Sequence, residues 1–232
     1  MKKVIYFIFV ILIFITYSCN DNRNGKIDLN ISEPDTSLIV QKKNSSKNLL
    51  TDFIPLFDDG DINVVVEIPS GTVDKWEVDK TDGQIKWEMV DNKPRVVDYI
   101  GYPGNYGMIP QTILPKELGG DGDPLDVLVI GSPVQRGTVI KCKLIGVLYL
   151  LDRGEQDDKL IAVQSGSSLY HINSLEELDK NYIGISTIIQ TWFTNYKGPN
   201  KMKSKGFDNT NKALEILHSA INEYKLKAIP SK

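Results

Sequence analysis

Three carboxylates stand within six residues near the middle of the chain, in the stretch Asp121-Gly122-Asp123-Pro124-Leu125-Asp126. An apolar run, Val127 to Ile130, follows directly. Asp, Gly and Pro favour turns, and a short unbroken apolar run favours a buried strand, so the acids should lie in a tight loop at the entrance of that strand. Like charges this close repel each other, and divalent cations held by oxygen ligands offset such repulsion in proteins. The stretch therefore predicts a metal site.

Further polar residues stand at places where strands or helices should end. A second acidic loop, Asp152 to Lys159, again follows an apolar run. Glu67 ends a β-rich stretch, and Lys75 and Glu77 should share one face of the next, because side chains alternate along a strand. The remaining groups are a Tyr- and Gly-rich turn from Tyr102 through Tyr106 to Gly107, and the pair Tyr196-Lys197 after an expected helix.

The elements that must position these groups are short strands followed by helices. We expect strands over residues 62–68, 73–78, 84–90, 96–100, 127–130, 139–151 and 159–163, and helices beginning after Ser174, over 183–196 and over 208–224. Ser174 and Asp208 are expected N-caps. Closely spaced short strands suggest a small barrel or sandwich, and helices that follow them favour an α+β fold in which the helices cover the strands.

Composition is ordinary for a globular protein. The 232 residues are 41% hydrophobic and 25% charged, and the formal net charge is −3. No basic stripe stands out, so we expect no nucleic-acid partner. Cys142 lies in an apolar stretch and should be a small core residue.

The N-terminus is typical of an export signal. Lys2 and Lys3 precede an apolar run that ends at Tyr17, and this run is too short to cross a bilayer comfortably. Cys19 follows a small residue, which resembles a bacterial lipoprotein signal. We therefore expect a signal peptide over residues 1–18, a lipidated Cys19 with a flexible tether over 19–52, and a catalytic domain over 53–232. An ordinary signal peptide or an uncleaved anchor are the alternatives.

The folded part resembles the soluble family I inorganic pyrophosphatases over roughly Ile62 to Tyr224. The family signature D-[GN]-D-P-x-D followed by an apolar strand stands here at Asp121–Asp126. The flanking motifs match in order, and they are Glu67-Ile68-Pro69, Lys75-Trp76-Glu77, Tyr102-Pro103 with Asn105-Tyr106-Gly107, the Asp152/Asp157/Lys159 loop and Tyr196-Lys197. A single acidic loop could arise by chance, but this ordered series is specific.

The resemblance implies a role for each matched residue. The metal-associated residues are Asp121, Asp126, Asp152 and Asp157, with Glu67 acting through water and Glu77 at the rim. Asp123 takes the proton from the attacking water. The phosphate-binding residues are Lys75, Arg95, Tyr106, Lys159, Tyr196 and Lys197, and Tyr102 forms a hydrogen bond within the site. Lys93 is a rival to Arg95, which stands about one residue out of register.

The implied reaction is hydrolysis of pyrophosphate to two phosphates with several Mg²⁺ ions, or with Mn²⁺ or a similar ion. A cleft lined by seven carboxylates must hold divalent cations if it is also to bind a tetra-anion. Such cations make water acidic enough to act near neutral pH, while Lys, Arg and Tyr stabilise the leaving phosphate.

The resemblance also implies a mainly β, α+β fold, in which a five-stranded barrel of the oligonucleotide-binding (OB) type is flanked by helices. A homo-oligomer, as in the hexameric bacterial members, is expected. The signal places the enzyme outside the cytoplasm on a lipid anchor, whereas most of the family is cytoplasmic. A non-catalytic binding barrel is the main alternative, but it does not explain why Lys159, Tyr196-Lys197 and the second acidic loop occur together.

Overall fold

The structure is a computed structural model that describes residues 47–120 and 122–228, all within one compact unit. The expected signal peptide, Cys19 and most of the expected tether lie outside the described residues, as does Asp121. Within the described part, no helix has both the length and the apolar character needed to cross a membrane.

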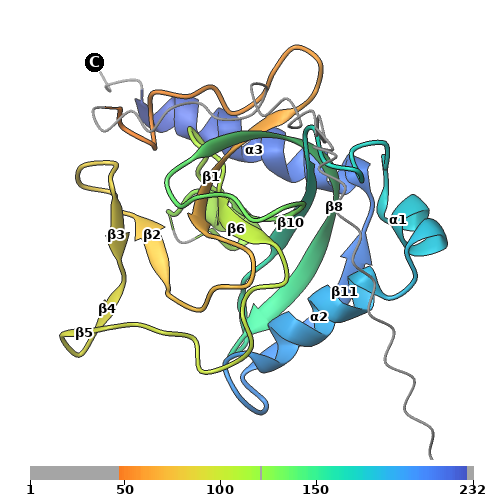
Figure 1. Cartoon of the computed structure of the whole chain (residues 1–232). Coiled ribbons are helices and arrows are strands. Elements are labelled where there is room, and N and C mark those ends of the chain that lie inside the picture. Colours follow the sequence, from red (N-terminus) through yellow and green to blue (C-terminus); the bar gives the residue numbers. More distant parts are fainter. Residues whose placement is uncertain (1–46, 121, 229–232) are drawn as a thin grey trace, which may run out of the picture. The chain divides into compact units, whose positions relative to one another are not determined.

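The described residues form strands in the first two thirds and helices mainly in the last third (Figure 1). The strands are β1 (Ile62–Ile68), β2 (Trp76–Val78), β3 (Ile85–Trp87), β4 (Met89–Val90), β5 (Lys93–Pro94), β6 (Asn105–Met108), β7 (Asp126–Ile130), β8 (Val139–Asp152), β9 (Glu155–Gln156), β10 (Lys159–Gln164) and β11 (Met202–Asp208). The helices are the 3₁₀ turn η2 (Lys116–Leu118), α1 (Leu175–Asn181), α2 (Ile185–Asn195) and α3 (Thr210–Ala228).

Five strands close into a ring. They pair in the order β1-β6-β7-β10-β8, and β8 pairs again with β1. β7 and β10 run parallel, whereas the other neighbours in the ring are antiparallel. β11 and β9 extend from β8 outside the ring. This arrangement confirms the expected mainly β, OB-like fold with flanking helices.

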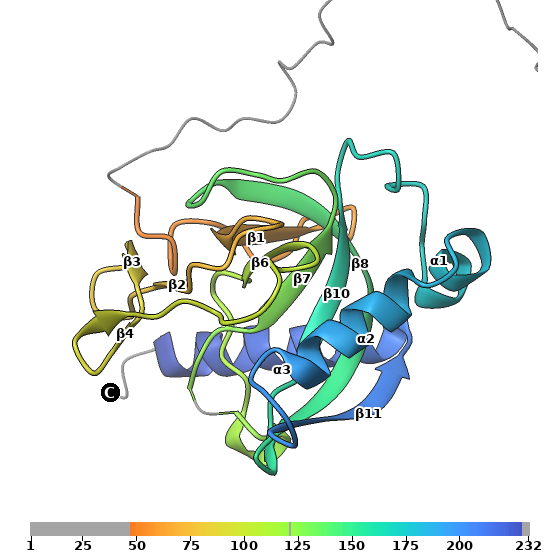
Figure 2. The ribbon, with the colours of Figure 1, turned by 60° about the horizontal axis from the view of Figure 1, so that its bottom comes forward.

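Two apolar clusters hold the helices on the ring. Along β7, Val127 and Val129 pack in a cluster that includes Leu217 of α3, whereas Leu128 packs in another that includes Trp192 of α2. This division follows from the two-residue alternation of a strand. Figures 1 and 2 show α3 lying along the ring and α2 beside β11, while the β2–β3 and β4–β5 hairpins lie on the side away from α1.

Some expected strands are shorter than the sequence suggests. Only residues 76–78 of the expected strand 73–78 form β2, and 96–100 contains a single bridge, between Asp74 and Val96. Backbone hydrogen bonds still join these stretches, since the Val97 and Lys75 amides donate to the Val73 and Arg95 carbonyls. The pairing is therefore present but too irregular to form a continuous ladder.

Strands β6 and β11 come from stretches in which the sequence pattern predicts no strand. β6 occupies the second half of the expected Tyr- and Gly-rich turn, where a Cβ on Gly107 would collide with the Val65 carbonyl oxygen. The lysine-rich stretch from Lys201 to Lys205 lies mostly in β11, with Met202 buried and Lys203 exposed. Neither stretch has the continuous apolar character of a buried strand. In β6 the close approach of the Val65 carbonyl requires a glycine, and β11 lies outside the ring, where lysines can reach solvent.

The helix starts agree with the sequence in one case and differ in another. The Ser174 hydroxyl accepts a hydrogen bond from the Glu177 amide and caps α1, as expected. Asp208 ends β11 instead of capping α3. The cap is Asn209, whose side chain accepts a hydrogen bond from the Lys212 amide.

Residues 47–52, which the sequence groups with the tether, pack on the ring. Leu49 is buried in a cluster with Val65 and Met108. Its amide donates to the Gly83 carbonyl, and the Leu50 carbonyl accepts from the Gln111 amide. Ordered contacts therefore begin at least as early as this segment.

Candidate active site

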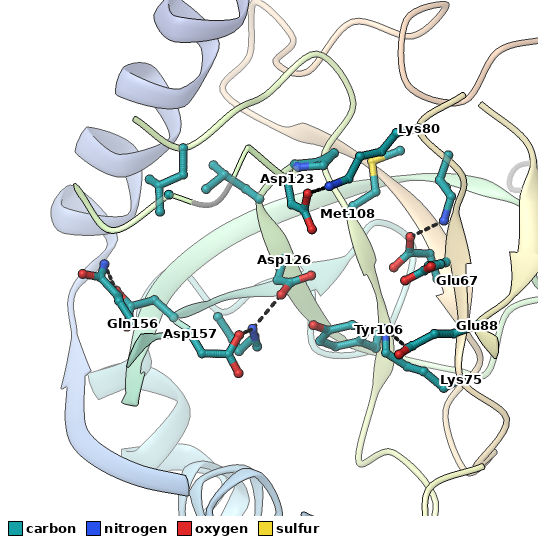
Figure 3. Close-up of a pocket in the computed structure, with 18 of the residues that line it drawn as sticks. Glu67, Lys75, Lys80, Glu88, Tyr106, Met108, Asp123, Asp126, Gln156 and Asp157 are labelled. Atoms are coloured by element: carbon teal, nitrogen blue, oxygen red, sulfur yellow. Dashed lines mark hydrogen bonds and ion pairs between the residues drawn. The ribbon is translucent and has the colours of Figure 1, made fainter. Parts of the chain in front are cut away.

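One cleft collects the charged residues of the separate motifs (Figure 3). Among the residues lining it are the acids Glu67, Glu77, Glu88, Asp123, Asp126, Asp157 and Asp158, the bases Lys75, Lys80, Arg95, Lys159 and Lys197, and the hydroxyl-bearing residues Tyr106 and Tyr196. They come from β1, β2, β6, β7 and β10, from the turns and short connections next to β2, β4, β5, β7 and β10, and from the segment after α2. Motifs far apart in the sequence therefore meet at one face of the ring.

Lys159 stands between two acids in this cleft. Because β7 and β10 pair in parallel with Val127 opposite Leu160, their first residues, Asp126 and Lys159, start side by side. The Lys159 ammonium donates to Asp126 at 2.6 Å and to Asp157 at 2.5 Å, and its side chain is 2% exposed. Burial favours the neutral amine, but the two carboxylates outweigh it and raise the pKa of Lys159.

Asp126 keeps its negative charge although it is largely enclosed. Loss of solvent alone would raise the pKa of this carboxyl group. The charges of Lys159 and Lys75 and the hydroxyl group of Tyr106 outweigh that effect and hold the pKa of Asp126 below its usual range. The cleft thus stabilises an ionised carboxylate at the start of β7.

Glu67 is the most enclosed acid among those that line the cleft. It lies at the end of β1 with 5% of its surface exposed, and it accepts a hydrogen bond of 2.8 Å from the Val78 amide. Burial raises its pKa to about 7, although the nearby charge of Lys75 opposes the shift. Metal-free, this residue is therefore partly protonated near neutral pH.

Lys75, just before β2, and Arg95, just after β5, both lie next to the carboxylate of Glu88. Arg95 Nη1 donates to Glu88 Oε1 at 2.6 Å, and Lys75 Nζ lies 4.0 Å from Glu88 Oε2. The Trp87 indole donates to the Arg95 carbonyl oxygen at 2.8 Å, which anchors the backbone there. Lys93, the rival to Arg95, is exposed in β5 and does not line the cleft.

An aromatic wall holds the tyrosines. Trp192 of α2 stacks on Tyr196 with ring centroids 4.6 Å apart and contacts Tyr102 at 4.3 Å, and its indole donates to the Ile100 carbonyl oxygen. Tyr102 in turn contacts Tyr106 at 5.1 Å. Burial raises the pKa of the Tyr106 hydroxyl well above its usual value, so it remains a hydrogen-bond donor. Tyr102 is buried behind the cleft and does not line it.

The second acidic loop connects to the cleft through Lys197. Lys197 Nζ donates to Asp152 at 2.7 Å and lies 3.8 Å from Asp157. The other oxygen of Asp152, Oδ1, is buried without a hydrogen-bond partner. Asp158, which also lines the cleft, accepts hydrogen bonds from the Leu150 amide and from the Gln156 side chain.

Asp123 lies in the loop before β7 and forms an ion pair with Lys80. Lys80 follows β2 in the turn toward β3, and its side chain is exposed at the rim. No sequence motif points to Lys80 or Glu88. Their charge alone gave no signal, since only the packing of the hairpins against the cleft places them there.

The described acids do not gather as a ready-made metal centre. In residues 47–120 and 122–228, no three His, Cys, Asp or Glu side chains group closely enough to hold an ion. Asp121, one of the expected ligands, lies outside these residues. The acids that are described engage lysines instead, with Asp126 and Asp157 on Lys159 and Asp152 on Lys197.

Known proteins match the chain across this whole region. The family model of inorganic pyrophosphatase matches residues 64–225. The inorganic pyrophosphatase of Campylobacter jejuni is 39% identical over 178 residues, covering 71% of this chain and 92% of the relative.

Solved structures give the same result. The inorganic pyrophosphatase of Thermus thermophilus superposes with a TM-score of 0.65 at 32% identity, covering 77% of this chain and 99% of that one. The Helicobacter pylori enzyme gives 0.63 at 34% identity, covering 75% and 99%. The chain therefore belongs to the inorganic pyrophosphatase family and is an enzyme that hydrolyses pyrophosphate.

Proposed function

We propose that the described cleft binds pyrophosphate and that Asp123 accepts a proton from the attacking water. The observation that carries the proposal is the convergence of separated motifs. Lys159, fully enclosed between Asp126 and Asp157, lies in the same cleft as Lys75, Arg95 and Lys197. This combination suits a polyanionic substrate that binds together with metal cations, because the bases can contact the anion and the acids can contact the cations.

The oxygen donors of the cleft suit hard divalent cations, and Mg²⁺ is the proposed one, with Mn²⁺ or a similar ion as a substitute. The family depends on divalent metal ions. The buried, unpartnered Asp152 Oδ1 and the enclosed carboxyl group of Glu67 are the features that a cation would satisfy. The proposed ligands are Asp121, Asp126, Asp152 and Asp157, with Glu67 and Glu77 at the periphery. When bound, the cations supply charge neutralisation and lower the pKa of coordinated water.

The chain's own bases bind and orient the substrate. Two of these bases, Lys75 and Arg95, lie on either side of Glu88. Lys159 and Lys197 both lie close to Asp157, and Tyr106 and Tyr196 line the same cleft. Glu88 fixes Arg95 through their 2.6 Å contact. These donors are oriented before the substrate arrives, so little reorganisation is needed as negative charge develops on the leaving phosphate.

The central test is phosphate release from pyrophosphate by the full chain, measured with and without Mg²⁺. We expect release that requires the metal and that EDTA abolishes. Metal-independent release, or none under either condition, contradicts the proposed mechanism.

Asp123→Asn separates proton transfer from metal binding. We expect kcat to fall about 10²- to 10⁴-fold, the usual contribution of a positioned general base. Mg²⁺ binding followed by calorimetry should stay close to that of the unmodified chain, because Asp123 is not a proposed ligand. A fully active variant would show that another group takes the proton.

We also propose that residues 1–18 are a signal peptide and that Cys19 carries a lipid, with a tether leading to the catalytic domain. The charged start, the short apolar run and the small residue before Cys19 support this proposal. Cys19→Ser should release the protein from membranes when cells are fractionated. If both forms stay in the cytosolic fraction, the enzyme is cytoplasmic like most of its family.

We infer, finally, that the chain assembles into a homo-oligomer, which is a hexamer by analogy with the bacterial members of the family. The large apolar side chains of Ile100, Ile183 and Ile188 are 69%, 93% and 59% exposed, which suits an interface. Light scattering of the purified protein measures the mass, and a monomer would contradict the inference.

A further inference from the structure

A second, smaller hollow opens beside the cleft and is strongly basic. The residues that line it are Arg95, Val96, Val97, Asp98, Arg153, Tyr196, Lys197 and Lys201. Four of these side chains are cationic and only Asp98 is acidic. A concave surface with this charge balance favours anions.

The hollow continues from one end of the cleft. Arg95, Tyr196 and Lys197 line both cavities and stand on the border between them. An anion bound to these three residues in the cleft would therefore have further cations on its outer side. Those cations are Arg153 and Lys201, which line the hollow alone.

Arg153 and Lys201 differ from the border residues in how their charge is used. Arg95 is paired with Glu88, and Lys197 is paired with Asp152. Neither Arg153 nor Lys201 has an acidic partner within 4.0 Å among the described residues. Their charge remains available to a ligand.

The backbone brings these two residues together. Arg153 lies in the turn that joins β8 to β9 and adopts a positive φ of 51°. Its amide donates to the Lys201 carbonyl oxygen at 2.8 Å, directly before β11 pairs with β8. The turn and the strand start are thus tied at the mouth of the hollow.

We propose that this hollow is a subsite for one more phosphate group than pyrophosphate contains, such as the terminal phosphate of a linear tripolyphosphate. The proposal rests on the proposed function, because it takes the cleft to hold the first two phosphates. The guanidinium group of Arg153 suits two-pronged binding of phosphate oxygens, and Lys201 adds a compact point charge. Tripolyphosphate carries more negative charge than pyrophosphate and can span both cavities.

Binding of tripolyphosphate, pyrophosphate and orthophosphate tests the subsite. We would measure it by calorimetry at fixed Mg²⁺ in the Asp123→Asn background, where turnover is slow, and by competition with pyrophosphate hydrolysis in the unmodified chain. Arg153→Gln and Lys201→Gln should each weaken tripolyphosphate binding about three- to tenfold, as expected for loss of one partly solvated charge contact. Pyrophosphate binding should change by roughly twofold or less, because screening by salt weakens the more distant charges.

Matched variants separate contact from general charge. Arg153→Lys keeps the charge and should retain most of the affinity for tripolyphosphate. Lys203→Gln removes an exposed lysine of β11 that does not line the hollow, and it should change neither ligand.

Each arm gives a distinct answer. If the variants weaken only tripolyphosphate binding, the hollow is a chain-extension subsite. If they weaken only orthophosphate binding, the hollow holds a separate phosphate ion, and the chain-extension proposal is wrong. If the variants weaken the binding of all three ligands equally, or of none, the proposed subsite is wrong. Calorimetry does not require turnover, so failure of pyrophosphate hydrolysis in the unmodified chain would count against the proposed function and not against the subsite.

Discussion

At the scale of single residues, Lys159 shows how the cleft tolerates its acids. This lysine is almost fully enclosed and touches two carboxylates, so it lies at the centre of the charge network. The resemblance to the pyrophosphatase family implies a phosphate-binding role for Lys159. The structure adds that it neutralises Asp126 and Asp157 from within the protein.

Lys159→Met should destabilise the metal-free protein because two acids lose their shared cation. The free energy of unfolding should fall by about 3 kcal/mol, at the low end for a broken buried pair because the acids are partly solvated. Urea unfolding in EDTA measures this loss, and Mg²⁺ should restore part of it. Lys159→Arg is the charge-conserving control. If the Met variant is as stable as the unmodified chain in EDTA, the ion pairs of Lys159 contribute little to stability.

Glu67 should make the metal-free protein less stable as the pH rises from about 4.5 to 7. Its pKa is about 7 in the folded chain and 4.5 in the reference state, so over this range the folded state holds a proton that the unfolded state has released. The unfolding free energy then decreases with pH. The loss is up to about 3 kcal/mol at roughly 1.4 kcal/mol per pKa unit, and it is complete above pH 7.

Glu67→Gln is the matched control for this pH dependence. The amide resembles the protonated acid and can still accept the hydrogen bond from the Val78 amide. Chemical unfolding in EDTA at several pH values should show a smaller slope for the variant than for the unmodified chain. Parallel stability curves would place the pKa of Glu67 near its ordinary value.

At the scale of elements, strands with an apolar or alternating pattern were predictable, whereas β6 and β11 were not. β1, β7, β8 and β10 are rich in apolar residues because most of their side chains are buried. β6 and β11 carry glycine or lysine, and their own sequences gave no strand pattern. Local pattern thus identifies most clearly the strands whose side chains pack in the core.

The start of α3 offers a test at this scale. Asn209→Ala should lower the unfolding free energy by about 1 kcal/mol, the usual contribution of an N-cap side chain. The hydrogen bond lost is the one from the Lys212 amide to Asn209 Oδ1, at 3.1 Å. Asp208→Ala is the comparison, since Asp208 was the cap expected from the sequence. If Asp208→Ala lowers the unfolding free energy more than Asn209→Ala does, Asp208 is the N-cap of α3.

At the scale of the whole molecule, pairing between strands that are distant in sequence brings the site together. The end of β1 pairs with β6, where Ile68 lies opposite Tyr106, and β6 pairs in turn with β7. This order places Glu67, at the end of β1, in the same cleft as Asp126 of β7 and Lys159 of β10. The ring closes at the other end of β1, where Ile62 pairs with Cys142 of β8. The segment before β1 then packs across the outside of this closure.

Leu49→Ala should therefore destabilise the catalytic unit although it lies in the segment expected to be a tether. Burial of Leu49 against Val65 and Met108 predicts a loss of about 2 kcal/mol in unfolding free energy. Thr51→Ala is the control, because Thr51 is exposed. Thermal unfolding compares the two variants. Equal midpoints would show that the folded unit begins after residue 52.

The sequence by itself determined the chemistry of this protein. The order and spacing of the acids, lysines and tyrosines carry it, because ligand type and charge are properties of residues and not of their arrangement. Only the tertiary structure shows that Arg95 and not Lys93 lines the cleft, that Glu88 and Lys80 line it too, and that Arg153 lies next to Lys201 beside it. These positions depend on strand register and sheet topology. Both are set by contacts between distant segments, which no local pattern records.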